Sequence, residues 1–98
     1  MELKLVSFNK ANDKKHKYEV VILNKKTNKE NLIKFGAYGM SDYTQHKDDE
    51  RKNLYDSRHN KNENWEDPLT AGFWAKWILW NKKTIKESLA DTIRRFKL

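Results

Sequence analysis

The sequence predicts an α+β fold, in which a small N-terminal antiparallel sheet of about three strands precedes three helices around a tryptophan-rich core. Two observations support this fold class. Apolar and polar residues alternate in short segments before residue 36, which is the period of half-buried strands. After residue 41 the apolar residues recur every three or four positions, as they do in helices. Ninety-eight residues suit one domain, so we expect a single domain over 1–98, with the sheet in 1–36 and the helical part in 41–98.

Three segments have the composition of strands, namely Glu2–Phe8, Tyr18–Leu23 and Asn31–Phe35. The second segment is apolar on both faces, which favours a central strand. The polar turn KKTNKE joins it to the third segment and predicts a hairpin. Lys25, Lys26 and Lys29 gather at the tip of this hairpin, which is either an ordinary solvated turn or a phosphate contact.

Gly36 and Gly39 predict a break after the third strand, and Ser41 or Asp42 is placed to cap a following helix. This helix should run from Tyr43 to about Lys61. One stripe of it carries Lys47, Arg51, Leu54, Tyr55 and Arg58. Basic groups one turn apart with an aromatic residue between them are typical of a surface that follows a phosphate backbone.

The same stripe has a second interpretation, which is a polar network packed against the next helix. In that case Arg58 or His59 would be paired with Asp67 or Glu66. The sequence keeps both interpretations open.

Asp67 and Pro68 predict the N-cap and the first residue of a central helix, which should end near Trp80. On this helix Lys76 should point away from the core. The apolar face combines Leu69, Phe73, Trp74, Trp77, Ile78 and Trp80. So wide an apolar band is expected to be buried.

Thr84 and Glu87 form the capping-box pattern T-x-x-E and predict the start of the last helix. Ile85, Leu89, Ile93 and Phe96 then repeat down one face of it. The predicted core is therefore Leu54, Trp65, Phe73, Trp74, Trp77, Ile78, Trp80, Ile85, Leu89, Ile93 and Phe96.

The chain has a formal net charge of +7 and a pI near 9.6, which point to a polyanionic partner. The basic excess lies in residues 1–35 and 67–98, whereas acidic residues outnumber basic ones in 36–66. The chain has no cysteine, which excludes disulfides and cysteine-ligated zinc. The N-terminus lacks an apolar run of signal-peptide length, and FWAKWILW is too short to span a membrane, so we expect no secretion and no membrane partner.

Candidate groups for chemistry are few. His46 with Asp48, Asp49 and Glu50 is the most metal-like cluster, although a charged helix surface has the same composition. Glu50-Arg51-Lys52 is similar to the E-x-K pattern of metal-dependent nucleases, but that pattern belongs on a strand and this segment is predicted as helix. We therefore expect a non-enzyme with no catalytic residue, no metal and no cofactor, and a nuclease is the third interpretation.

The pieces G-x-x-G-x-x-D-Y-T-x-H-K-D, R-x-x-x-Y-x-x-R-H, W-x-D-P-x-T-A-G-F-W and L-W-N-K-x-T follow one another between Lys34 and Phe96 and end in R-R-F. This run resembles a family of small basic proteins encoded by giant DNA viruses of the mimivirus and chlorella-virus kind and by their transpovirons. The resemblance implies a viral protein near DNA, in the factories of the host cytoplasm or in the virion. The stretch Lys4 to Glu30 departs most from the family pattern.

Charge and resemblance together favour a non-catalytic protein that binds DNA with little sequence preference, as in genome packaging or compaction. RNA is the alternative polyanion. The expected contacts are Lys47, Arg51, Arg58, Lys82, Lys83, Lys86, Arg94, Arg95, Lys25 and Lys26. The alternative function is an interaction module, with exposed aromatic residues forming a homodimer or binding another protein.

Overall fold

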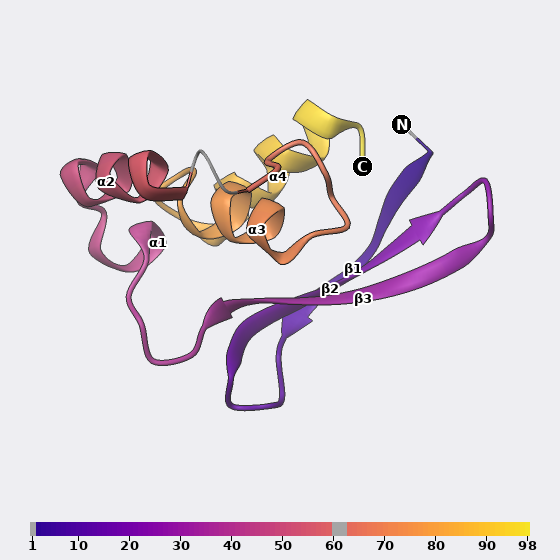
Figure 1. Cartoon of the computed structure of the whole chain (residues 1–98), viewed down its shortest axis with the longest axis horizontal. Helices are drawn as coiled ribbons and strands as arrows, with labels where there is room; N and C mark the ends of the chain where they lie inside the picture. Colours follow the sequence, from indigo (N-terminus) through magenta and orange to yellow (C-terminus); the bar gives the residue numbers. More distant parts are fainter. Residues whose placement is uncertain (1, 60–62) are drawn as a thin grey trace.

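The three predicted strands form one antiparallel sheet in chain order, in the computed structural model described for residues 2–59 and 63–98 (Figure 1). They are β1 (Leu3–Lys10), β2 (His16–Asn24) and β3 (Lys29–Ala37). β2 lies in the centre, as its apolar composition predicts. The predicted α+β class is confirmed, and helices follow the sheet along the chain.

A β-bulge at Val6 sets the core face of β1. Leu5 pairs with Ile22 and Ser7 pairs with Val21, so Val6 is an extra residue in the register. The bulge brings Phe8 opposite the buried Val20, where strict alternation from Leu5 would have placed Ser7. Without it the large ring would face solvent.

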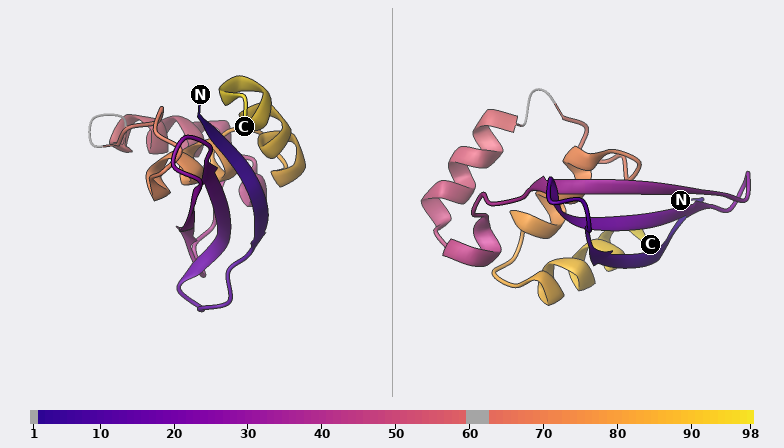
Figure 2. Two further views of the ribbon diagram at one scale, coloured as in Figure 1. Left: turned by 90° about the vertical axis from the view of Figure 1, so that its right-hand side faces the viewer. Right: turned by 90° about the horizontal axis from the view of Figure 1, so that it is seen from below.

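The helices lie on one side of this sheet, and α1 and α2 extend beyond its end (Figures 1 and 2). They are α1 (Tyr43–His46), α2 (Asp49–His59), α3 (Ala71–Trp74), the π-helical turn η1 (Ala75–Leu79) and α4 (Ile85–Phe96). The buried apolar cluster between sheet and helices consists of Leu3, Val20, Ile22, Ile33, Phe35, Phe73, Trp74, Ile78 and Leu79. Every helix in the described residues is too short or too polar to span a lipid bilayer.

The predicted helix from Tyr43 to Lys61 is wrong as one element, because it breaks at Lys47. Lys47 has φ +55°, a left-handed conformation that ends α1. The carboxylate of Asp48 then accepts the amides of Glu50 and Arg51 and starts α2. Asp42 caps α1, as predicted, and residues 60–62 lie outside the described residues.

The central helix begins at Ala71, three residues later than Pro68. Thr70 is its N-cap, since its hydroxyl accepts the Phe73 amide at 3.2 Å. The Asp67 carboxylate instead accepts the Leu69 amide within the preceding turn. The helix ends at Leu79, close to the predicted end near Trp80.

The predicted core needs two kinds of correction. Leu54 and Ile93 are exposed, by 55% and 37%, and Trp65 lies only part-buried outside the apolar cluster. Ile93 faces outward because the side of α4 that packs against the molecule carries polar groups. The Thr92 hydroxyl donates to the Ser88 carbonyl at 2.7 Å, and the Asp91 carboxylate accepts from Asn81 at 2.8 Å.

The second correction concerns the sheet and the remaining helical positions. Five of the nine residues of the apolar cluster come from strands, which the predicted core left out. Phe73, Trp74 and Ile78 are buried as predicted. Trp77, Trp80, Ile85, Leu89 and Phe96 pack around the cluster as partly buried residues.

Candidate nucleic-acid interface

A column of stacked rings attaches α2 to the rest of the molecule. The Tyr55 ring is buried and lies 4.4 Å from the Trp80 ring, with only 5° between their planes. The His59 ring stacks on Tyr55 at 4.2 Å. Burial, and then the charges of nearby carboxylates led by Glu63, raise the pKa of the Tyr55 phenol, so the ring stays uncharged. This column fixes the side of α2 that carries Tyr55 and leaves the adjoining positions Arg51, Leu54 and Arg58 exposed to solvent.

Lys76 provides a second attachment, and the prediction that it points away from the core is wrong. Its ammonium lies 3.0 Å from a carboxylate oxygen of Asp56 on α2. It also lies 5.0 Å from the centre of the Trp65 ring and 5.4 Å from that of Trp77. A cation placed between two indoles and one carboxylate is stabilised although its side chain is mostly buried.

The solvent side of α2 holds two arginines beside one shallow groove. Arg51 and Arg58 line this groove of about 230 Å³ together with Leu54 and Trp80. Both arginines are exposed, and Arg51 donates to the Ser41 hydroxyl at 3.3 Å. Within residues 2–59 and 63–98 no carboxylate pairs with either guanidinium. Two unpaired guanidinium groups on one rigid helix are suited to bind phosphates.

Lys47 does not belong to this face. It lies in the left-handed turn between α1 and α2, where its ammonium donates to the Thr44 carbonyl at 3.2 Å. Tyr55 is on the buried side of α2. Of the predicted stripe, the structure therefore brings together Arg51, Leu54 and Arg58.

The basic residues around α4 fall into two groups. Arg94 and Arg95 are paired with the buried Asp91, at 2.7 and 3.4 Å, and Arg95 also covers the Trp77 ring. Lys82, Lys83 and Lys86 are exposed, and in the described parts of the chain no ion pair involves them. Because Trp80 stacks on Tyr55, the segment that carries Lys82 and Lys83 begins beside α2.

Lys25, Lys26 and Lys29 lie at the far end of the molecule. They occupy the tip of the β2–β3 hairpin, which projects away from α2 (Figure 1). The Asn24 side chain accepts the Lys26 amide at 3.0 Å and closes this turn. The hairpin lysines and the α2 arginines are thus two separate basic regions.

The cluster around His46 is occupied by internal hydrogen bonds. The His46 Nδ1 atom accepts the Asp48 amide at 3.0 Å, and Asp49 accepts from the Tyr43 hydroxyl. No group of three histidines or carboxylates in the described residues is arranged to hold a metal ion.

The partners predicted for a polar network are also wrong. His59 is paired with Glu63 at 3.0 Å, not with Glu66 or Asp67. The Trp65 indole donates to the other oxygen of Glu63 at 3.0 Å. Arg58 remains on the solvent side.

The four tryptophans offer little free surface. Trp74 is fully buried, and Trp65, Trp77 and Trp80 are part-buried. Among the described aromatic residues Tyr38 is the most exposed, at 65%. An interaction surface built on exposed aromatics would therefore depend on Tyr38, which lies in the break that Gly36 and Gly39 predict.

In the comparison with known families, residues 6–59 match a family of unknown function, DUF5754. The matched region runs from β1 to the end of α2 and includes both arginines of the groove. No curated protein and no solved structure matches the chain.

Proposed function

Since the chain belongs to the DUF5754 family, whose description names no activity, we propose from its surface chemistry that it is a non-catalytic DNA-binding protein with little sequence preference. The observation that carries the proposal is the pair Arg51 and Arg58, exposed beside one groove and without a carboxylate partner in the described residues. Arginines exposed in this way are suited to bind phosphate oxygens, and such contacts carry no sequence information.

The distribution of ion pairs supports this assignment. Lys17, Lys34, Lys76, Arg94 and Arg95 are each paired with an aspartate. Such pairs neutralise part of the positive charge of the chain. Other basic side chains keep their positive charge on the surface that starts at α2, namely Arg51, Arg58, Lys82 and Lys83. There the charge can replace the counterions of a nucleic acid.

The biological setting in the proposal comes from the sequence resemblance. A protein of a giant virus or of an associated mobile element, in a viral factory of the host cytoplasm or in the virion, would meet large amounts of DNA. Binding with low sequence preference suits packaging or compaction.

The test is a gel-shift series with duplex DNA, single-stranded DNA and RNA at several salt concentrations. The logarithm of the affinity should fall linearly with the logarithm of the salt concentration, with a slope of about −0.9 for each phosphate engaged on a duplex. The double variant Arg51→Ala/Arg58→Ala should reduce that slope by about two and weaken binding to all DNA sequences alike.

The matched control is Lys25→Ala/Lys26→Ala, which removes the same charge at the far hairpin tip. It should change binding much less than the arginine pair. Equal losses in both double variants would show that only net charge matters. RNA displacing DNA at equal length would contradict DNA as the partner, and failure to bind any nucleic acid at low salt would refute the proposal.

A further inference from the structure

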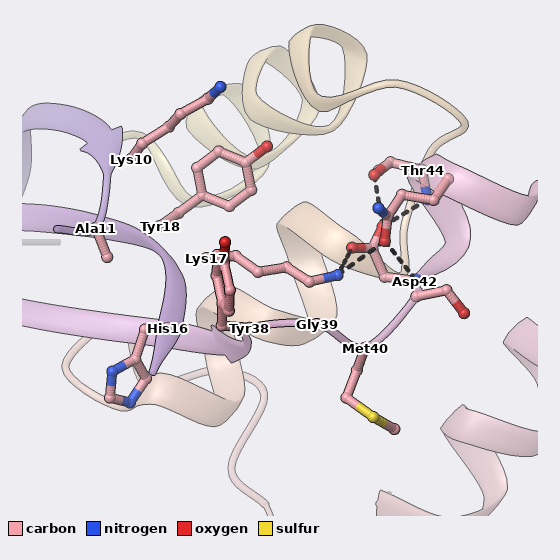
Figure 3. Close-up of a pocket in the computed structure, with 12 residues that line it drawn as sticks. Lys10, Ala11, His16, Lys17, Tyr18, Tyr38, Gly39, Met40, Asp42 and Thr44 are labelled. Atoms are coloured by element: carbon pink, nitrogen blue, oxygen red, sulfur yellow. Dashed lines mark hydrogen bonds and ion pairs between the residues drawn. The ribbon is translucent and has the colours of Figure 1, made fainter. Parts of the chain in front are cut away.

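A pocket lies between the β1–β2 hairpin and the segment that connects β3 to α1 (Figure 3). Its volume is about 410 Å³, within the range of about 300 to 1,000 Å³ typical of small-molecule sites. Lys10 and Tyr18 line it from the hairpin, Tyr38 lines it from the connecting segment, and Thr44 lines it from α1. None of the functional residues predicted from the sequence belongs to it.

The pocket offers hydrogen-bond donors. Three of its polar groups have no side-chain partner within residues 2–59 and 63–98, namely the hydroxyls of Tyr18 and Tyr38 and the ammonium of Lys10. The two hydroxyls point into the space between the lining side chains (Figure 3). The Lys17 ammonium is bound to Asp42 and Gln45. Asp42 also accepts the amide and hydroxyl of Thr44, so its oxygens are already occupied.

Tyr18 is a fixed wall of the pocket. Its ring stacks on Phe8 at 5.2 Å, and Phe8 packs on Phe35. Burial, and to a lesser degree the charge of Asp42, raise the pKa of the Tyr18 phenol. Its hydroxyl therefore remains a donor at neutral pH.

Tyr38 is exposed but held in place by its backbone. Its amide donates to the Lys15 carbonyl at 3.1 Å, which fastens the connecting segment to the β1–β2 hairpin. Gly36 and Gly39 flank it with φ of +79° and +88°, and these conformations favour glycine. A Cβ on Gly36 would also lie 2.7 Å from Leu79. The backbone at Tyr38 is therefore fixed, so that only its side-chain torsions lose freedom when a ligand stacks on the ring.

A second hollow lies between the pocket and the arginine groove. Its volume is about 450 Å³, and it shares Lys17 and Met40 with the pocket and Arg58 and Trp80 with the groove. A flexible strand whose phosphates contact Arg51 and Arg58 would pass over this hollow to reach the pocket.

We propose that the pocket receives one unpaired nucleotide of single-stranded DNA, with its base on the Tyr38 ring and its phosphate near Lys10. This inference rests on the proposed function, and it specifies the form of DNA that is bound. In a duplex the base faces are stacked and the pairing edges are occupied, so neither the ring nor the phenolic donors could reach them. In a single strand, a base on an aromatic ring and phosphates on basic side chains are the usual contacts.

The experiment compares three ligands of equal length, which are an oligothymidylate, the same strand with abasic sites, and a duplex. The abasic strand keeps every phosphate and removes the bases. Wild-type protein should bind the intact strand about 5- to 150-fold more tightly than the abasic one, the range for stacking of one base.

Tyr38→Ala should remove most of this difference by weakening only the intact strand, and Tyr38→Phe should keep most of it. Lys26→Ala, a lysine outside the pocket, should leave the ratio unchanged. Because Tyr38 is exposed, the substitution should not unfold the protein.

Two results separate this inference from the proposed function. If Arg51→Ala/Arg58→Ala weakens binding while intact, abasic and duplex ligands bind equally well, DNA binding stands and the nucleotide pocket is refuted. If Tyr38→Ala still binds the intact strand more tightly than the abasic strand by the same factor, the nucleotide pocket is refuted as well. If wild-type protein binds none of the three ligands at low salt, the proposed function itself has failed.

Discussion

The sheet with α3, η1 and α4 differs from the α1–α2 region in what holds it together. The buried apolar cluster comes entirely from the three strands, α3 and η1. The α1–α2 region contributes two buried tyrosines, Tyr43 and Tyr55. It is attached by the ring stack on Trp80 and by two ion pairs, Lys76–Asp56 and Lys17–Asp42. The first region depends on buried area and the second on a few directional contacts. Part of the proposed DNA-binding face thus lies on the less tightly held region.

The largest expected effect comes from Trp74→Ala, because Trp74 is fully buried and its indole donates to the Pro68 carbonyl at 2.7 Å. The free energy of unfolding should fall by about 3 to 5 kcal/mol, enough to threaten folding. Denaturant unfolding followed by circular dichroism measures this loss. Leu69→Ala, at a side chain that is 40% exposed, is the control and should cost much less. Similar losses in both variants would contradict a core centred on Trp74.

An intermediate effect is expected at Asp91, which ties α4 to the end of the central helix. The Asn81 amide, together with Arg94 and Arg95, lowers the pKa of this carboxyl below its ordinary 3.8. Asp91→Asn should cost about 1 to 3 kcal/mol at pH 7. A lowered pKa stabilises the fold above 3.8, and this stabilisation is lost as the pH falls toward the folded-state pKa.

The stability difference between wild type and Asp91→Asn should therefore narrow below about pH 4. Unfolding curves at several pH values measure it. A difference that stays constant from neutral to acid pH would mean that the Asp91 charge does not contribute.

The smallest expected loss of stability should distinguish the two regions most clearly. Trp80→Leu removes the stack on Tyr55, which is worth about 0.5 to 1.5 kcal/mol beyond the buried area, and keeps an apolar side chain against the core. Amide hydrogen exchange should become faster in α2 and stay unchanged in β2. Equal acceleration in both elements would show that α2 and the sheet unfold as one cooperative unit.

Much of the fold could be predicted because its signals are local. The alternating strands, the caps at Asp42 and Thr84, and the end of the central helix all depend on neighbouring residues. The break at Lys47 could not be predicted, because lysine has no preference for the left-handed conformation that it adopts there. The start at Thr70 was missed because Asp67-Pro68 is an equally good capping signal, and here it serves a turn.

The candidate site was predicted only in part. Helical spacing correctly placed Arg51 and Arg58 on one face of α2. It could not show that Arg94 and Arg95 share Asp91, or that Lys76 is buried against Asp56, since these depend on packing between elements. The Tyr18–Tyr38 pocket was missed because it joins side chains twenty positions apart through the sheet.

The π-helical turn η1 makes the link between the two regions tolerant of a change in chain length. A π turn holds one more residue than an α turn, so deleting one residue from Ala75–Leu79 would let the segment become an ordinary helix. Because the shorter α turn then replaces the longer π turn, the residues on either side would keep nearly the same orientation around the helix axis. Trp80 would stay beside the Tyr55 ring, and the arginine face would keep its place.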